Sequence, residues 1–207
     1  MSRPKHTHED CLGLERIVFF SDAVFAIAIT LLSLDIKLPS EQGSLTKLVM
    51  TNHDLFVELT GIWVKYVDYV ISFLVIGLFW KAHLAKFRLI KRYDSTLILL
   101  NLLFLMVIAF IPFPTRILAE FGKQIATICY ALTMVAASIL SALLWWYASS
   151  GNRLIDAGLN PLQRRRRLLS PLTMAIVFLV SIALAFVNDD LARLSWLFLI
   201  PAALYIG

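Results

Sequence analysis

Six long runs of apolar residues, separated by short polar stretches, dominate the pattern along this chain. A helix needs about 20 mostly apolar residues to cross the hydrocarbon core of a bilayer. The sixth run is shorter and reaches the end of the sequence without a polar tail. The pattern predicts an all-α polytopic membrane protein, a single six-helix transmembrane domain over residues 1–207. The expected spans lie near residues 17–38, 61–85, 95–116, 124–147, 169–187 and 192–207.

The composition supports lipid as the solvent for most of this chain. Of its 207 residues, 59% are hydrophobic and 16% are charged, and the mean hydropathy is +0.79. Soluble domains carry about 25% charged residues. The net charge of +5 would suit nucleic acid as a partner, but in a membrane chain it is better read as an orientation signal. We therefore expect the lipid bilayer as a partner and no nucleic acid.

The basic residues fall unevenly on the two sides of the expected spans, with thirteen on one side and six on the other. Short loops rich in lysine and arginine stay in the cytoplasm, so both termini are predicted to be cytoplasmic. Trp145, Trp146 and Tyr147 are expected to end the fourth span at that interface. The thirteen are Arg3, Lys5, Arg16, Lys81, Lys86, Arg88, Lys91, Arg92, Arg153 and Arg164–Arg167.

Two shorter features lie between or within the spans. Residues 44–59 have helical spacing of apolar side chains and mixed charge, which predicts a short amphipathic helix on the outer surface. Pro112 and Pro114 interrupt the end of the third span and predict a kink or a terminus.

The first span carries an ionisable residue, Asp22, one to two turns inside its apolar stretch. A charged residue near the bilayer centre costs about 2.5–3.5 kcal/mol on insertion scales, so it usually faces protein or water. Asp22 is then either a hydrogen-bonded contact between helices or a site on an ion path. Both interpretations bury one face of the first span in a bundle.

An apolar stripe lies roughly opposite Asp22 on this span. At about 100° per residue, Ile27, Leu31 and Leu34 fall on one face, Phe20 and Val24 extend that face, and Thr30 sits at its edge. Periodicity alone favours lipid contact or ordinary helix packing. A pore lined by rings of these side chains in a symmetric oligomer is the alternative.

Three motifs give this chain a resemblance to a known family. They are Arg16-x3-Phe20-Ser21-Asp22 followed by Ala-Ile-Ala-Ile-Thr-Leu-Leu, Trp80-x-x-His83 in the second span, and Asn101-Leu-Leu-Phe-Leu with Ile111-Pro-Phe-Pro-Thr115 in the third. In these motifs the chain resembles the transmembrane protein 175 family of potassium channels. The likeness covers spans one to three, whereas the later half matches only in hydropathy and length.

The resemblance implies a homotetramer in which the first helix of each six-helix subunit lines a central pore for K⁺, in a prokaryotic plasma membrane. It implies Ile27 as the narrowest constriction, with further rings at Leu31 and Leu34, and Thr30 as a selectivity residue. It implies no filter of the Thr-Val-Gly-Tyr-Gly type, and the sequence contains none. The polar network implied to hold the first span consists of Arg16, Ser21, Asp22, Trp80 and His83.

Other functions have weaker support in the sequence. A secondary transporter using Asp22, and Asp35 with it, is the main alternative, although no internal repeat is evident. A membrane scaffold without transport activity is a third. The sequence has no catalytic arrangement or phosphate-binding glycine loop, so we expect no enzyme, no metal site and no cofactor.

Overall fold

The computed structural model describes residues 8–34, 51–156 and 158–198, and these are almost wholly helical. The described part contains one isolated antiparallel bridge, between Ile90 and Ile155. In chain order the elements are α1 (His8–Leu34), α2 (Asn52–Gly61), α3 (Trp63–Phe87), α4 (Ser95–Phe110), α5 (Pro112–Phe121), α6 (Gln124–Ser149), the 3-10 turn η3 (Ser150–Asn152), α7 (Pro161–Ala185), α8 (Asp189–Leu194) and the 3-10 turn η4 (Ser195–Phe198).

Five segments of the described chain are long and apolar enough to cross a membrane. The predicted count of six is therefore not confirmed. The described part of the sixth expected span, 192–207, consists of the end of α8 and of η4, and residues 199–207 lie outside the described chain. Of the expected amphipathic segment 44–59, residues 52–59 form most of α2 and residues 44–50 also lie outside it. The five segments are Leu12–Leu34, Lys65–Phe87, Ser95–Phe121, Gln124–Asn152 and Pro161–Ala185.

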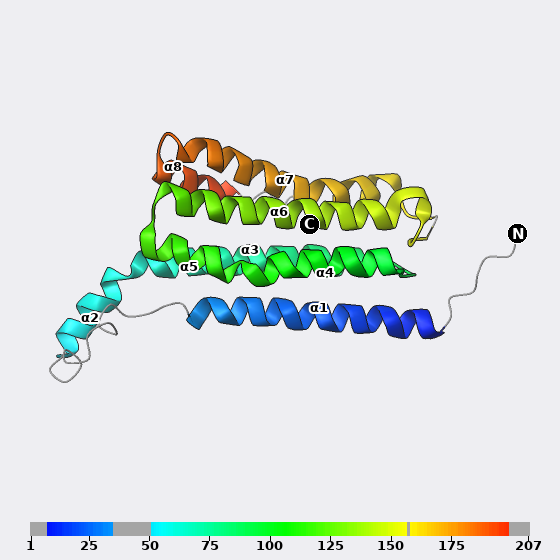
Figure 1. Cartoon of the computed structure of the whole chain (residues 1–207), viewed down its shortest axis with the longest axis horizontal. Helices are drawn as coiled ribbons and strands as arrows, with labels where there is room; N and C mark the ends of the chain where they lie inside the picture. The colour runs from blue at the N-terminus through cyan, green and yellow to red at the C-terminus, as the bar shows by residue number, and fades with distance from the viewer. Residues whose placement is uncertain (1–7, 35–50, 157, 199–207) are drawn as a thin grey trace, which may run out of the picture.

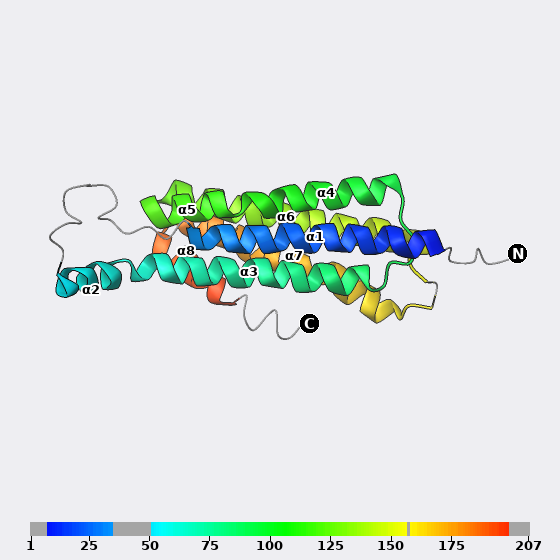
Figure 2. The ribbon, with the colours of Figure 1, turned by 90° about the horizontal axis from the view of Figure 1, so that it is seen from below.

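The long helices run side by side in layers (Figure 1). Helix α1 lies along one edge of the bundle, α6 and α7 form the opposite edge, and α3, α4 and α5 lie between them. Seen from the α1 edge, α3 flanks α1 on one side and α4 with α5 on the other (Figure 2). Helix α2 projects beyond one end of the bundle. Helix α1 therefore presents one face to the other helices and another to the exterior of the bundle.

The two prolines in the third span produce a kink and do not end it. Proline has no N–H to donate, so the helical hydrogen bonds are interrupted where α4 meets α5. Ile111 still has helical backbone angles (φ −53°, ψ −40°), and the apolar segment continues to Phe121. Gly122 ends it in the left-handed conformation (φ +55°), which glycine adopts without steric cost.

Helix α7 begins eight residues before the expected fifth span, at Pro161 rather than at 169. The side chain of Asn160 accepts a hydrogen bond from the Leu162 N–H (2.9 Å), and Pro161 suits the first turn of a helix. The sequence-based prediction placed Arg164–Arg167 in a loop, and this is wrong. The four arginines occupy the first turns of α7, because a cap and a proline start the helix before its apolar part.

A buried core runs the length of the bundle in two clusters. The larger joins α1, α3, α4, α6 and α7, and the smaller lies at the end where α3 and α6 finish. Trp145 belongs to the smaller cluster and is fully buried, with its Nε1–H donating to the carbonyl of Arg164 (3.0 Å). Of the aromatic residues expected to end the fourth span, Trp145 is therefore buried within the bundle, whereas Trp146 is exposed.

Candidate functional site

Helix α1 has a buried face and an exposed face. Ser21, Phe25, Ala28 and Leu32 are buried, and they recur at intervals of three or four residues, which places them on one side of the helix. This side packs against α3, α4 and α5. The contact fixes which residues of α1 face away from the subunit.

The expected apolar stripe lies on the exposed face. Ile27, Leu31 and Leu34 are 58%, 41% and 69% exposed, and Phe20 is exposed beside them. Val24 differs from the expectation, because it is half-buried and packs against the main core. The structure thus groups the three residues of the predicted constriction on a surface that the subunit does not cover.

Thr30 also lies on the exposed face, with its hydroxyl engaged by its own helix. Its Oγ1 donates to the carbonyl of Ile27 (2.9 Å), and Ser33 donates in the same way to the carbonyl of Thr30 (2.7 Å). Because the proton of Thr30 is used in this bond, the oxygen lone pairs remain available as acceptors on the exposed side. This arrangement suits contact with a cation or with water.

A buried chain of hydrogen bonds ties α1 to α4 and α3. Ser21 Oγ donates to the carbonyl of Ile17 (2.8 Å) and accepts from Asn101 Nδ2 (3.0 Å), and Asn101 Oδ1 lies 2.8 Å from His83 Nε2. Since Asn101 presents its oxygen to His83, Nε2 of the histidine must carry a proton and donate. Ser21, Asn101 and His83 Nε2 each have a partner of the correct kind, whereas Nδ1 of His83 is buried without a partner among the described residues. The bonds that are made specify how α1 is rotated against its neighbours.

His83 is held in an aromatic environment as well. Its ring stacks on Phe87 with centroids 4.3 Å apart and lies nearly parallel to Phe104 at 5.7 Å. Phe25 of α1 contacts the same ring at 5.7 Å. The side chain is buried, and its position at the junction of α1, α3 and α4 explains how a single histidine fixes three helices.

Asp22 of α1 forms a hydrogen bond with Trp80 of α3. The indole Nε1–H of Trp80 donates to Asp22 Oδ1 at 2.8 Å. This second bond joins α1 to α3 beside the Ser21 path. Four of the five residues of the expected polar network therefore take part in contacts between helices, whereas Arg16 is exposed and takes no part in these contacts within the described chain.

Two buried polar residues that join helices were not predicted from the sequence. Asn101 appears in a recognised motif, yet its role as the bridge between Ser21 and His83 depends on the distance between two helices. Lys86 is buried and its ammonium donates to the carbonyl and hydroxyl oxygens of Ser141 (2.8 and 2.6 Å). A polar residue at a helix position otherwise facing the core is the signal that could have found both.

A second buried polar group lies farther along the bundle. Ser72 of α3 is within hydrogen-bonding distance of Thr115 Oγ1 (3.2 Å) and of the Tyr130 hydroxyl (3.3 Å). Asp68, one turn earlier on α3, is also buried, and its Oδ2 has no hydrogen-bond partner among the described residues. These side chains lie inside one subunit, away from the exposed face of α1.

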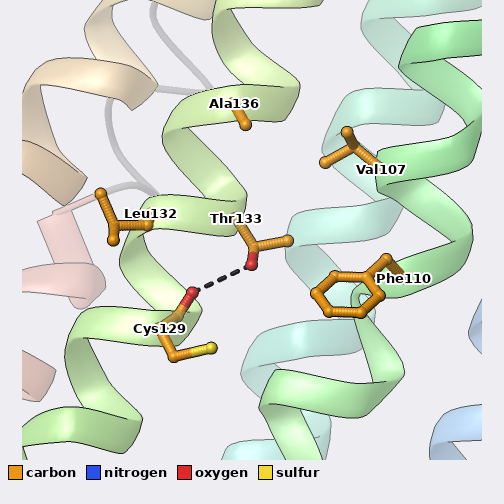
Figure 3. Close-up of a pocket in the computed structure, with 6 residues that line it drawn as sticks. All are labelled: Val107, Phe110, Cys129, Leu132, Thr133 and Ala136. Carbon is orange, nitrogen blue, oxygen red and sulfur yellow. Dashed lines mark hydrogen bonds between the residues drawn. The ribbon is translucent and has the colours of Figure 1, made fainter.

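One open pocket lies between α4 and α6 and has a volume of about 310 Å³. Figure 3 shows its lining, in which the Thr133 hydroxyl bonds the carbonyl of Cys129 (2.9 Å) within the same helix. With that hydroxyl engaged, the lining is almost entirely apolar and unsuited to an ion. The described residues also contain no group of three or more metal-ligating side chains. The lining residues are Val107, Phe110, Cys129, Leu132, Thr133 and Ala136.

Comparison with known proteins identifies the family. A family model described as endosomal/lysosomal potassium channel TMEM175 matches residues 16–112. A protein of Streptomyces collinus named as a potassium channel is 39% identical over 182 residues, which are 85% of this chain and 84% of the relative. The chain belongs to the TMEM175 family.

Further TMEM175 relatives support this assignment. A protein of Chamaesiphon minutus named as a potassium channel is 37% identical over 144 residues, 68% of each chain. A crystal structure of a homolog of the lysosomal potassium-selective channel TMEM175 from Chamaesiphon minutus superimposes with a TM-score of 0.79 at 30% identity. It covers 94% of this chain and 98% of the other.

The part of the chain that matches the TMEM175 model contains the whole hydrogen-bonded contact between α1, α3 and α4. Ser21, Asp22, Trp80, His83 and Asn101 all fall within residues 16–112, whereas α6 and α7 lie beyond them. The relative from Streptomyces collinus matches over 182 residues, so the likeness extends into the later half of the chain, where the sequence predicted a match in hydropathy and length only. The resemblance on which the sequence analysis relied is therefore confirmed at the level of the family.

Proposed function

We propose that this chain is a potassium-permeable cation channel, a homotetramer in which α1 of each subunit lines the pore. The observation that carries the proposal is the apolar face of α1, exposed at Ile27, Leu31 and Leu34 while the opposite face is fixed by hydrogen bonds. The names of the relatives, which are channels and not enzymes, give the ion. The permeant K⁺ is the expected ligand, without a cofactor.

The proposed constriction works by excluding water. Rings of Ile27, Leu31 and Leu34 would make a narrow apolar passage, and such a passage closes to ions by dewetting. Opening then requires a wider ring, through rotation of α1 or a change of side-chain rotamer. Aliphatic carbons cannot replace the hydration shell of an ion, so in this proposal the acceptor oxygen of Thr30 supplies the preference for K⁺.

The polar contacts would set the orientation of the pore-lining face. Ser21 and Asp22 hold α1 against Asn101 and Trp80, and Ile27 lies about 120° around the helix from Ser21. A change in either contact would rotate the stripe. We also propose that Arg16 belongs to this network and acts where α1 enters the bundle.

The transporter alternative has no comparable support. The carboxylate of Asp22 is bonded to Trp80 in a contact between two helices of one subunit, and Asp35 lies outside the described residues. A coupled transporter needs an ionisable group that faces a cavity, and Asp22 does not line the pocket between α4 and α6, whose lining is almost wholly apolar.

We further propose that the N-terminus lies in the cytoplasm of a prokaryotic cell, with six spans placing the C-terminus there too. The end of the bundle where α3 finishes and α7 begins carries Arg88 and Arg164–Arg167, whereas Arg116, Lys123 and Arg193 lie toward the opposite end. Positively charged ends of membrane helices stay in the cytoplasm. Protease or cysteine-labelling access from each side of oriented vesicles would test this.

The channel is tested by measuring K⁺ flux into liposomes that contain the purified full-length chain. The wild type is compared with Ile27→Asn and with Ile176→Asn. Ile176 on α7 is 59% exposed, close to the 58% of Ile27, so the pair is matched in exposure and chemistry. We expect wild-type flux above empty liposomes, a several-fold increase for Ile27→Asn because a polar ring wets the constriction, and wild-type flux for Ile176→Asn. The assembled particle should have the mass of four 23.4 kDa subunits.

Two results would contradict the proposal. The first is wild-type flux no greater than that of empty liposomes. The second is equal behaviour of the two asparagine variants together with loss of a coupled flux in Asp22→Asn, which would favour the transporter.

A further inference from the structure

The basic residues at the start of α7 are divided between two faces of the helix. Arg165 and Arg166 are exposed, whereas Arg164 and Arg167 are half-buried. Arg164 and Arg167 are three residues apart and share the face of Pro171, Ala175 and Phe178, which packs into the bundle. Arginines that served only as topology anchors would have no reason to face the bundle.

Helix α7 brings Arg167 close to the basic end of α3. The segment that follows α3 is joined to the segment that precedes α7 by the bridge between Ile90 and Ile155, and α3 contacts α7. The basic end of α3 and the start of α7 therefore lie at the same end of the bundle (Figure 2). The ammonium of Lys86 is buried and bonded to Ser141. Lys86, Arg88 and Arg167 therefore lie at the same end of the bundle.

These cations have no acidic partner in the described chain. The described residues form one salt bridge, Arg116–Glu120, which lies elsewhere on α5. Asp94 accepts from Leu97 N–H (2.8 Å) and from the Tyr147 hydroxyl (2.6 Å). Asp156 is exposed and forms no salt bridge with a described residue.

One polar atom of this cluster is shielded from solvent and lacks an acceptor. Nε of Arg167 is buried and has no hydrogen-bond partner among the described residues. A buried donor without an acceptor costs free energy, so native proteins usually supply one. An anion seated between Arg88 and Arg167 would accept this bond and balance the charge.

The depth of the cluster in the membrane indicates the kind of anion. Residues 168–185 of α7 follow the arginines directly and form an apolar stretch about 27 Å long at 1.5 Å per residue. This length matches the hydrocarbon core, so the arginines lie at the level of the headgroups. Leu169 is exposed at the next turn and offers an apolar surface to an acyl chain.

From these observations we propose that Arg88 and Arg167 form a binding site for the phosphate of an anionic phospholipid, where the end of α3 meets the start of α7. Arginine suits this role because its planar guanidinium binds phosphate oxygens in pairs. The exposed Arg165 and Arg166 attract the lipid from the surrounding leaflet. This site is separate from the exposed face of α1 and does not depend on conduction.

The test is lipid binding to the purified full chain in neutral detergent, measured by native mass spectrometry. Phosphatidylglycerol and phosphatidylcholine with the same acyl chains are compared, and we expect a preference of about tenfold for the anionic lipid, equivalent to about 1.4 kcal/mol. Arg88→Gln/Arg167→Gln should reduce the preference to about twofold or less. The charge-matched control, Lys65→Gln/Lys123→Gln on other parts of the bundle, should retain it.

Two further variants keep the test informative if the double variant does not fold. Arg88 is exposed, so Arg88→Gln alone should fold and lose part of the preference. Arg167→Lys keeps the charge but removes the Nε donor, and we expect about a threefold weaker preference. An Arg167→Lys protein that binds as the wild type does would overturn the specific role of this guanidinium.

Other results would overturn the site itself. Equal binding of the two lipids by the wild type would mean that the arginines act only in topology. An equal loss in the lysine control would mean general electrostatic attraction. Displacement of phosphatidylglycerol by millimolar inorganic phosphate would identify a site for free phosphate instead of a lipid headgroup.

Discussion

Helices α1 and α6 are both long and apolar, yet the subunit uses them differently. In the most apolar stretch of α6, 61% of the residues are buried, whereas in that of α1 the share is 22%, the lowest of the five candidate spans. Helix α6 contacts α4, α5 and α7, and α1 lies at the edge against α3, α4 and α5 (Figure 1). Apolar composition alone therefore does not tell which helix forms the centre of a membrane subunit.

The two helices are also held by different forces. Lipid is as apolar as leucine, so helices associate in a membrane through close packing and hydrogen bonds rather than through the hydrophobic effect. The buried face of α6 is rich in small residues such as Ala131, Ala137 and Ser138, which allow neighbouring helices to approach closely. Helix α1 has a smaller packed face and relies on the bonds of Ser21 and Asp22.

The largest effect is expected from removing packed volume in α6. Met134 is fully buried in the main core, and Met134→Ala should lower the free energy of unfolding by about 2 kcal/mol because it leaves a cavity. Ile27→Ala on the exposed face of α1 should change it by less than about 0.5 kcal/mol in single subunits. Reversible unfolding in mixed micelles measures both.

The oligomeric state must be followed in the same samples, by chemical cross-linking. In samples without oligomers, Ile27→Ala could lower the free energy of unfolding as much as Met134→Ala does. This would mean that the outward face of α1 is packed within one subunit. That result would remove the contrast between the two helices.

A second, smaller effect is expected at the polar contact of α1. Asn101→Ala removes the bonds to Ser21 and His83, and we expect a loss of about 1–2 kcal/mol, since hydrogen bonds between membrane helices contribute about 0.6 kcal/mol on average and up to about 1.7. A double-mutant cycle with Ser21→Ala isolates the α1–α4 bond. A coupling free energy indistinguishable from zero would mean that packing, and not this bond, positions α1.

Much of this contrast is visible in the sequence, and part of it is not. The spacing of Ile27, Leu31 and Leu34 predicts their common face, because a helix has a fixed period. Sequence cannot say whether that face is covered, and only the positions of the neighbouring helices show its exposure. The same limit applies to Asn101, whose partners lie 18 and 80 residues away in the chain.

Helix boundaries were predicted less well, for local reasons. The apolar pattern places the fifth span at 169–187, but the cap of Asn160 and the position of Pro161 start α7 earlier. Similarly, a proline often ends a helix, but after Pro112 and Pro114 the kinked segment continues as far as Gly122. In both cases the caps and the surrounding structure, and not the hydropathy pattern, set where the helix begins or ends.

A third prediction concerns the bond between Trp80 and Asp22. Trp80→Phe keeps an aromatic ring and removes the indole donor at 2.8 Å from Asp22, so we expect a loss of about 0.6–1 kcal/mol in unfolding. Trp146→Phe on α6 is a matched control, since this tryptophan is also exposed and Asp22 accepts from Trp80 instead. A loss of the same size in both variants would show that the ring, and not the bond, stabilises α1.

Substitution of Thr30 is expected to have the smallest effect on stability and to change function alone. Thr30→Val keeps the shape of the side chain and removes the oxygen that we propose contacts the permeant ion. Among the described residues the hydroxyl of Thr30 bonds the carbonyl of Ile27 (2.9 Å). We expect unfolding within about 0.5 kcal/mol of the wild type and a fall of several-fold in the K⁺ over Na⁺ permeability ratio, measured by reversal potentials. Thr133→Val is the matched control, because that threonine bonds the carbonyl of its own helix in the same way (2.9 Å) but faces the apolar pocket on α6. A permeability ratio unchanged in Thr30→Val, or lowered equally in Thr133→Val, would mean that selectivity arises elsewhere and that the exposed face of α1 contributes only the apolar constriction.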